Sequence, residues 1–278
     1  MTKFIGVEYS RGATAKIIEG GPALAPAAVR EMFPRDNWTI ISPKSVSAEE
    51  CMADRFGDAF AVHKQVYAAT PADRHIFIGG DHSVNFGHFT AIADQMPNED
   101  LCLIYIDAHL DIHTPESSQT EASGAPHGTN VRANLGVGDN RWMSLMQKFP
   151  ALKPENLFYL GSRSYEPSEI QFVRENGIFM RSAEELQTDG DLDDAITEIR
   201  RQIDGRPFVV SFDFDAIDPQ YFKDVWVPEP GGISMYTARR LTREFADAHS
   251  FEFVEYAPTG DENSANAVRE LVEIAANQ

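Results

Sequence analysis

The chain of 278 residues contains only two cysteines, Cys51 and Cys102. They do not form a C-x-x-C pair, and this argues against a structural zinc site and against dithiol redox chemistry. A chain of this length buries enough apolar surface to fold without disulfide bonds. Cys102 lies in the apolar run 101–106 and is expected to be a buried strand residue.

Basic residues are scarce, because 24 lysines and arginines stand against 43 acidic residues and the formal net charge is −19. This balance argues against a nucleic-acid partner, since phosphate backbones are bound by clustered lysine and arginine. It also argues against binding to an anionic membrane surface. With 42% hydrophobic and 24% charged residues, the composition is still that of a globular protein and not of a disordered acidic chain.

Long hydrophobic runs are also missing from the sequence. No stretch approaches the roughly 20 apolar residues that a membrane-spanning helix needs. The first residues, Met1–Gly6, lack the apolar core of a signal peptide. We therefore expect a soluble, cytoplasmic protein that does not bind membranes.

Short apolar runs alternate with helix-like segments along the whole chain, and no repeat or linker interrupts them. Several runs are apolar at nearly every position, as in strands that are covered on both faces. The expected strands are Lys3–Val7, Trp38–Ile41, His75–Ile78, Leu101–Ile106, Leu157–Leu160, Pro207–Phe212 and Phe251–Val254. The expected helices are Pro26–Phe33, Val84–Gln95 with Ser83 as N-cap, Leu192–Ile203, Thr237–Ala248 and Ser264–Ala276.

This alternation predicts an α/β fold with a parallel sheet and helices on both of its faces, as one domain over residues 1–278. Residues 111–143 and 222–234 are rich in turn-forming residues and have no strong period. Long loops inside a compact domain are usually functional, so both segments are candidates for a binding site.

Polar residues follow four of the expected strands at the point where each strand ends. They are Gly79–Ser83, Asp107–Asp111, Ser211–Asp215 and Glu255. In an open parallel sheet, ligands bind outside the carboxyl ends of the strands. We therefore expect these residues to meet at one edge of the sheet.

Aspartates at alternate positions dominate these strand ends. Asp107, His109 and Asp111 point the same way if the segment is extended, and Asp213 and Asp215 repeat the spacing. Four converging carboxylates repel one another unless cations lie between them.

Together with His82, these residues form a set of four aspartates and two histidines. Such donors suit Mn(II), Fe(II), Mg(II), Co(II) or Zn(II), and not Cu(I) or an iron–sulfur cluster. Two ions that share carboxylates about 3.5–4 Å apart would form a two-metal hydrolytic site. Each residue alone has a simpler explanation, and Asp81 is itself expected to be a turn residue. The joint pattern at several strand ends favours the metal site.

These motifs resemble those of the ureohydrolase family, which includes arginases and agmatinases. Gly79–Ser83, Asp107–Asp111 and Ser211–Pro219 occur in the family order, and the resemblance extends to Gly21–Arg30 and Ser123–Gly128. It covers most of the chain. The resemblance implies an arginase-like three-layer α/β/α sandwich around a parallel sheet, in agreement with the alternation of strands and helices.

The resemblance also implies two Mn²⁺ ions per chain. The ligands of one ion would be His82, Asp107, Asp111 and Asp213. The ligands of the other would be His109, Asp107, Asp213 and Asp215. Asp107 and Asp213 would bridge the two ions.

Three residues carry the implied chemistry, which is hydrolysis of a guanidinium carbon to urea and an amine. Glu255 matches the family carboxylate that pairs with the substrate guanidinium, and a planar guanidinium binds a carboxylate through two hydrogen bonds. His127 matches a loop histidine that shuttles protons or contacts the substrate, although a solvated loop histidine is the alternative. Asp111 joins them as a metal ligand with a catalytic role.

The segments that would contact the rest of the substrate resemble arginases more than agmatinases. Ser123 lies in the matching loop, and Glu166 and Glu169 take the places of two acidic residues that address the α-amino group. These glutamates also fit the first turn of a helix that starts near Pro167. His113, however, stands where arginases have the asparagine that binds the α-carboxylate.

A cationic guanidino compound is therefore the expected partner, and its identity is open. The first hypothesis is an arginase-type enzyme that forms ornithine from arginine. Conversion of peptidyl-arginine to peptidyl-ornithine is a close variant, because a peptide has no free α-carboxylate for His113 to recognise. An agmatinase or a guanidino-acid hydrolase is the next alternative.

Other classes are less favoured. A formimidoylglutamate hydrolase would lack the element that joins Ser123 and His127, and a non-enzymatic relative or a single-metal deacetylase would not need all six ligands. The family resemblance also implies a homo-oligomer.

Overall fold

The computed structural model describes residues 2–13 and 20–277 of the chain. Met1 and Gln278, the limits of the predicted domain, therefore lie outside the described residues. Met1 is also the first residue of the segment that was compared with signal peptides. Within the described part, no helix is both long and apolar enough to cross a membrane.

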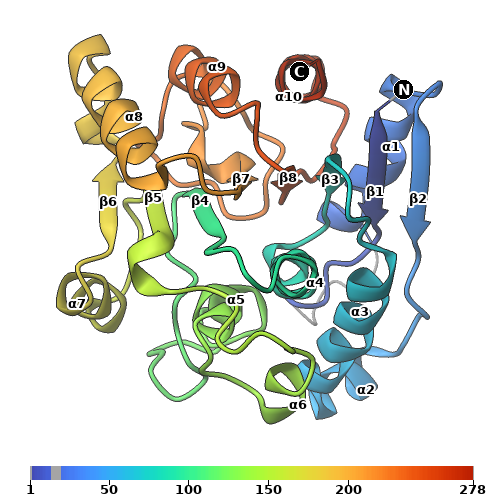
Figure 1. Cartoon of the computed structure of the whole chain (residues 1–278). Coiled ribbons are helices and arrows are strands. Elements are labelled where there is room, and N and C mark those ends of the chain that lie inside the picture. Colours follow the sequence, from blue (N-terminus) through green and yellow to red (C-terminus); the bar gives the residue numbers. More distant parts are fainter. Residues whose placement is uncertain (1, 14–19, 278) are drawn as a thin grey trace.

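The described strands form one parallel sheet of eight strands in the order β2-β1-β3-β8-β7-β4-β5-β6 (Figure 1). The strands are β1 (Lys3–Val7), β2 (Asn37–Ile41), β3 (His75–Ile78), β4 (Cys102–Ile106), β5 (Leu157–Gly161), β6 (Phe179–Ser182), β7 (Phe208–Asp213) and β8 (Ser250–Val254). The central strands β3, β8, β7 and β4 are buried at every residue.

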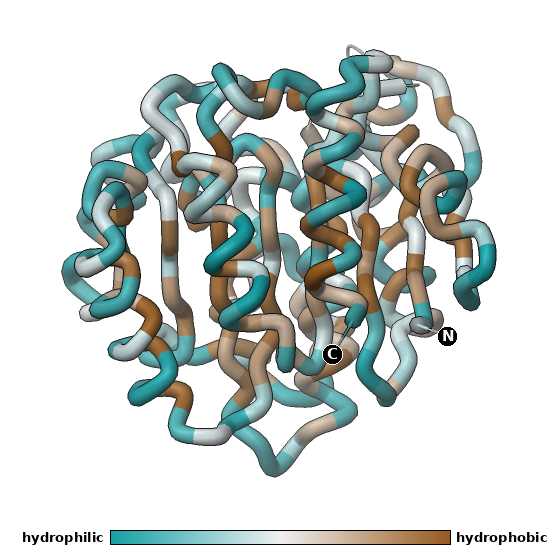
Figure 2. Tube along the Cα trace, turned by 90° about the horizontal axis from the view of Figure 1, so that it is seen from above, coloured by the Kyte–Doolittle hydropathy of each residue, from teal (hydrophilic) through white to brown (hydrophobic). Residues whose placement is uncertain are grey.

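Helices cover both faces of this sheet (Figure 1). One hydrophobic core joins the sheet to α1 (Ala25–Met32), α8 (Asp189–Ile203), α9 (Met235–Glu244) and α10 (Glu262–Ala276). The second core joins its other face to α3 (Arg55–Ala69), α4 (Asn85–Gln95), α5 (Asn130–Asn134), α6 (Asn140–Met143) and α7 (Pro167–Glu175). Figure 2 shows hydrophobic segments running through the middle of the molecule. The predicted three-layer α/β/α sandwich is confirmed.

The structure adds several elements that the pattern of apolar residues did not predict. They are the edge strand β6 and the helices α2 (Ala48–Ala53), α3, α5 and α6. The second half of the expected loop 111–143 is therefore partly helical. The prediction that Ser83 is the N-cap of α4 is wrong. Ser83 lies inside a short 3₁₀ helix, His82–Val84, and the carboxylate of Asp81 caps the first turn of that helix.

Close contact between the segment after β1 and the turn after β3 positions the first motif. The backbone N–H of Asp81 donates to the carbonyl of Tyr9 at 2.8 Å. A Cβ atom on Gly80 would lie 1.6 Å from this carbonyl oxygen, so only glycine fits there. The Asp81 carboxylate accepts the N–H groups of Gly12 and Ala13, which brings the loop after β1 to the rim of the same sheet edge. Asp81 is thus a turn residue, as expected.

Candidate active site

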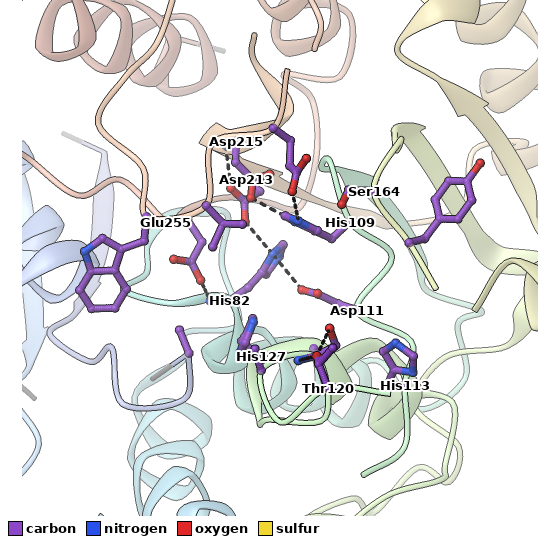
Figure 3. Close-up of a pocket in the computed structure, with 18 of the residues that line it drawn as sticks. His82, His109, Asp111, His113, Thr120, His127, Ser164, Asp213, Asp215 and Glu255 are labelled. Atoms are coloured by element: carbon purple, nitrogen blue, oxygen red, sulfur yellow. Dashed lines mark hydrogen bonds and ion pairs between the residues drawn. The ribbon is translucent and has the colours of Figure 1, made fainter. Parts of the chain in front are cut away.

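A cavity of about 360 Å³ opens at the carboxyl ends of the central strands. All predicted site residues except Asp107 line this cavity, and they are His82, His109, Asp111, His113, Ser123, His127, Glu166, Glu169, Asp213, Asp215 and Glu255. Figure 3 shows those that it labels, among them His82, Asp213 and Glu255, pointing toward one another from the ends of β3, β7 and β8. The sequence motifs therefore meet at one sheet edge.

The first group of candidate ligands surrounds the Nδ1 atom of His82. This atom lies 2.9 Å from Oδ2 of Asp107, 3.2 Å from Oδ2 of Asp213 and 3.5 Å from Oδ2 of Asp111. Asp111 has a left-handed backbone with φ of 50°, and the hydroxyl of Tyr105 donates to its carboxylate at 2.8 Å. The chain thus turns sharply at Asp111 while a buried donor fixes the side chain.

The second group surrounds the Nδ1 atom of His109. It lies 3.1 Å from Oδ2 of Asp215 and 3.4 Å from Oδ1 of Asp107. Backbone N–H groups of His109 and Ala108 donate to Asp107 and Asp215, respectively, and so hold both carboxylates in place. Asp107 belongs to both groups, as a bridging ligand would.

The geometry of both groups fits a divalent cation. An octahedral ion with bonds of about 2.1 Å places neighbouring ligand atoms about 3.0 Å apart, close to the nitrogen–oxygen distances found here. In each of the triads His82–Asp107–Asp111 and Asp107–His109–Asp215, the ligand atoms lie within 4.8 Å of one another. Oδ2 of Asp107 is buried and has no hydrogen-bond partner in the described part of the protein, as expected for an oxygen that binds an ion.

Electrostatics point the same way. Burial and repulsion from Asp107 raise the pKa of Asp111 to about 7. Burial raises the pKa of Asp213 well above its usual range, and repulsion from Asp215 and Asp107 adds to this. The protein alone therefore disfavours the charged form of these carboxylates, and a cation between them would remove the penalty.

Glu255 lies beside this cluster, directly after β8. The backbone N–H of His82 donates to its Oε1 atom at 2.8 Å. Its backbone also has a left-handed φ of 62°, which aims the side chain into the cavity at a conformational cost (Figure 3). Burial raises the pKa of Glu255, with a further contribution from Asp213, so this carboxylate too would be stabilised by a cation.

His127 also lines the cavity (Figure 3). Its Nδ1–H donates to the carbonyl of Gly12 at 3.2 Å, and its side chain is half-buried, so the alternative of a solvated loop histidine does not describe it. Burial lowers the pKa of His127 to about 4. The imidazole is therefore neutral at pH 7 and has a free lone pair on Nε2.

The far end of the cavity is formed by a buried histidine and two glutamates. Nε2 of His113 lies 3.2 Å from Oε2 of Glu169 and 3.6 Å from Oε1 of Glu166. The glutamates also form a capping box at the start of α7, in which Glu166 N–H donates to Glu169 at 2.9 Å. The predicted helix start near Pro167 is confirmed, and both glutamates reach the cavity from it.

Some cavity residues were not assigned to a site by the sequence motifs, and these include Ala13, Thr120, Ser164 and Tyr165. They lie in loops whose residue types are common, so no spacing pattern distinguished them. Trp226 also lines the cavity. Its ring fits against Gly21, where a Cβ atom would lie 1.9 Å from the indole.

Comparisons with known proteins agree with this fold and site. A sequence model described as the arginase family matches residues 3–277. The arginase of Entamoeba histolytica is 32% identical over 192 residues, which are 67% of this chain and 63% of that protein. The arginase of Bacillus caldovelox is 32% identical over 198 residues, which are 69% of this chain and 64% of that protein. The chain thus aligns with somewhat less than two thirds of each of these relatives.

The fold is also similar to that of solved structures. The crystal structure of Entamoeba histolytica arginase in complex with L-ornithine superposes with a TM-score of 0.83 over 99% of this chain and 97% of that chain, at 22% identity.

Proposed function

Because the chain belongs to the arginase family, we propose that it is a metal-dependent hydrolase that cleaves a C–N bond of a guanidino substrate and releases urea. One observation carries the proposal: buried aspartates and histidines converge in two groups on a cavity that also contains the carboxylate of Glu255. The donors suit a divalent cation, and the carboxylate suits a guanidinium.

We assign two Mn²⁺ ions to the two groups. His82, Asp107, Asp111 and Asp213 would hold one ion. His109, Asp107, Asp213 and Asp215 would hold the other. Bound ions of this kind supply a water-derived nucleophile near neutral pH and offset negative charge that develops in the transition state.

Two further side chains of the protein would act on the substrate. Glu255 would accept two N–H groups of the guanidinium and hold its carbon against the metal groups. His127 would accept or return a proton at Nε2, because its Nδ1–H already donates to Gly12. Its low pKa favours the neutral, proton-accepting form.

For the substrate, we propose the side chain of arginine. Glu166 and Glu169 place negative charge on the wall of the cavity beside His113, where an α-ammonium group could bind. His113 partly neutralises this charge through its contact with Glu169. The α-carboxylate and α-ammonium groups of free arginine would therefore bind beside two glutamates and a histidine. Arginases have an asparagine at the position of His113.

Peptidyl-arginine is the second candidate, and the rim of the cavity favours it. Tyr165 is 39% exposed and Val227 is 48% exposed, and both line the opening. Exposed apolar side chains at the mouth of a site can pack against residues that flank the reacting side chain. Free arginine has no such residues.

A urea-release panel would test both candidates. The protein is stripped with chelator, reloaded with Mn²⁺ and incubated with L-arginine, agmatine, 4-guanidinobutyrate and an arginine-containing peptide. We expect urea from arginine or the peptide, and the ratio of the two kcat/KM values separates the candidates. Metal-loaded protein that releases no urea from any guanidine would refute the proposed activity.

Replacement of Glu255 by glutamine tests the proposed guanidinium contact. Glu255→Gln should keep the metals, because this residue is not among the proposed ligands, and should lower kcat/KM about 100-fold, since a charged bidentate contact is lost. Elemental analysis and the urea assay give the two readouts. Glu121→Gln is the control, because that side chain is 77% exposed and should retain wild-type activity. Full activity of Glu255→Gln would contradict the assigned role.

A further inference from the structure

A network of buried polar side chains lies behind the candidate metal groups, inside the core. Its centre is Glu252 of β8, which has no exposed surface and takes no part in the proposed reaction. Ser211 of β7 is its direct neighbour in the sheet register, so both side chains point to the same face. Burial of a carboxylate lowers the stability of the fold unless donors surround it. We therefore expect Glu252 to have a function.

The direction of each hydrogen bond follows from the far end of the network. Nδ1 of His75 lies 2.8 Å from the carbonyl oxygen of Asp73, which can only accept, so Nδ1 carries a proton. Burial lowers the pKa of His75 to about 3, so its Nε2 has a lone pair. Nε2 of His88 lies 2.8 Å from this atom and must donate to it.

Side chains of helix α4 face Glu252. Nδ1 of His88 lies 3.5 Å from Oε1 of Glu252, and neither atom has a hydrogen-bond partner in the described part of the protein. The amide of Asn85 donates to Oε2 at 2.6 Å, and its orientation is fixed because its own oxygen accepts from Asn134. Burial alone would raise the pKa of Glu252, but His88 lowers it below the usual range. Glu252 is thus held as an acceptor.

Ser211 connects Glu252 to the candidate metal ligand His82 through hydrogen bonds. Its Oγ atom lies 2.6 Å from Oε2 of Glu252 and 2.8 Å from Nε2 of His82. The hydroxyl has one proton, and it points to the carboxylate, which can only accept. Oγ therefore accepts from Nε2–H of His82. With a proton held on Nε2, Nδ1 is the ring atom that faces the aspartates of the first metal group and would be left to bind an ion.

We propose that Glu252 is a positioning residue that acts through Ser211 to hold His82 with its proton on Nε2 and its Nδ1 atom free to bind a metal ion. The inference rests on the proposed metal site. Groups that orient a metal-binding histidine in this way typically contribute 10–100-fold to metal affinity. Glu252, His88 and Asn85 would then serve the site without touching metal or substrate.

Metal affinity of the stripped protein is the first test, with Mn²⁺ as the probe and free Mn²⁺ measured by electron paramagnetic resonance. Ser211→Ala and Glu252→Met should each weaken binding by about 10–100-fold. Glu252→Gln should stay within about threefold, because its carbonyl can still accept from Ser211 and Asn85 while its amide donates to His88. The double variant Ser211→Ala/Glu252→Met should bind no more weakly than the weaker single variant, since both changes break one path.

Wild-type metal affinity in folded Glu252→Met would overturn the proposal. The proposal would also be overturned if the double variant lost as much binding free energy as the two single variants together, because independent effects on the fold add in this way. The proton position provides a second measurement if Glu252→Met does not fold. In zinc-loaded wild-type protein and Glu252→Gln, histidine nitrogen NMR should place the His82 proton on Nε2; a proton on Nδ1 would overturn the inference. Tight metal binding that depends on Glu252, without urea release from any guanidine, would refute the proposed function and leave the positioning role intact.

Discussion

At the scale of single residues, His63 is enclosed by the aromatic part of the core. Its ring has no exposed surface, and its centroid lies 4.3 Å from that of Trp142 and 5.2 Å from that of Phe86. Neither ring nitrogen has a hydrogen-bond partner among residues 2–13 and 20–277. Burial lowers the pKa of His63 to about 3, so the native state holds this residue uncharged.

This burial predicts a pH dependence of stability. Between pH 6.5 and about 3, the unfolded chain binds a proton at His63 that the native state does not bind, so the free energy of unfolding falls as the pH falls. The loss is about 1.4 kcal/mol per pH unit. From pH 7.5 to pH 5.0, the wild type should lose about 2 kcal/mol more than His63→Phe in urea unfolding. Equal losses would show that His63 is not buried neutral.

The same scale shows what the sequence could predict of the site. The six candidate ligands and Glu255 stand in short motifs at strand ends, so their spacing and the sheet rule were enough to bring them together. The positioning residue Glu252 gave no such signal. Its partners His88 and Ser211 are 164 and 41 positions away in the chain, and only the packing of α4 and the strand order make them neighbours.

At the scale of secondary-structure elements, the half-buried Arg74 contacts the ends of two helical segments. The guanidinium of Arg74, directly before β3, donates to the carbonyl of Ala246 at 2.8 Å and to that of Ala275 at 2.5 Å. Ala275 lies in the last turn of α10, where carbonyl groups have no partner within the helix. A cation at a helix C-terminus also interacts favourably with the helix dipole.

Removing this contact should destabilise the fold. Arg74→Met is expected to lower the free energy of unfolding by about 2–3 kcal/mol, because two carbonyls lose a charged donor. Arg201→Met on α8 is the control, since Arg201 pairs with no residue but the neighbouring Glu198 in the described part of the chain and its side chain is 68% exposed. It should cost no more than about 0.5 kcal/mol. Urea unfolding at pH 7.5 gives both values. Equal losses of unfolding free energy in the two variants would show that the Arg74 contacts do not stabilise the fold more than an exposed ion pair does.

Elements were predictable where apolar residues follow a clear period. β4 is buried at all five residues, and α10 buries one regular stripe, so both were expected within two residues of their limits. α3 was missed because its buried face includes His63 among polar neighbours, and this obscures the helical period. β6 was missed because it is a half-buried edge strand that contains Arg181 and Ser182.

At the scale of the whole molecule, the candidate metal site ties together strands that lie far apart in the chain. Its ligands follow β3, β4 and β7, which belong to the middle of the sheet. An ion bound only by the native state stabilises it by about 2.7 kcal/mol at a concentration of 100 Kd. For a chain of this size, this is a rise in Tm of about 5–10 °C.

Metal removal is therefore expected to lower the stability of the entire domain. Excess EDTA should lower the Tm of Mn²⁺-loaded protein by about 5–10 °C in one cooperative transition, and added Mn²⁺ should restore it. Calorimetry measures both steps. Asp213→Asn is the control, because it lacks a proposed bridging ligand and its Tm should not respond to Mn²⁺. A Tm of the wild type that is insensitive to EDTA and Mn²⁺ would contradict a metal site that involves these strands.

The position of β8 in the sheet affects how the protein can fold during synthesis. This last strand of the chain inserts between β3 and β7, so the sheet consists of two separate halves until residues 250–254 arrive. During synthesis, Glu252 and Glu255 are made only after all six candidate metal ligands. The facing edges of β3 and β7 are open to wrong partners during this time. A chain released before this point would contain all six candidate metal ligands and still lack the strand that closes the site.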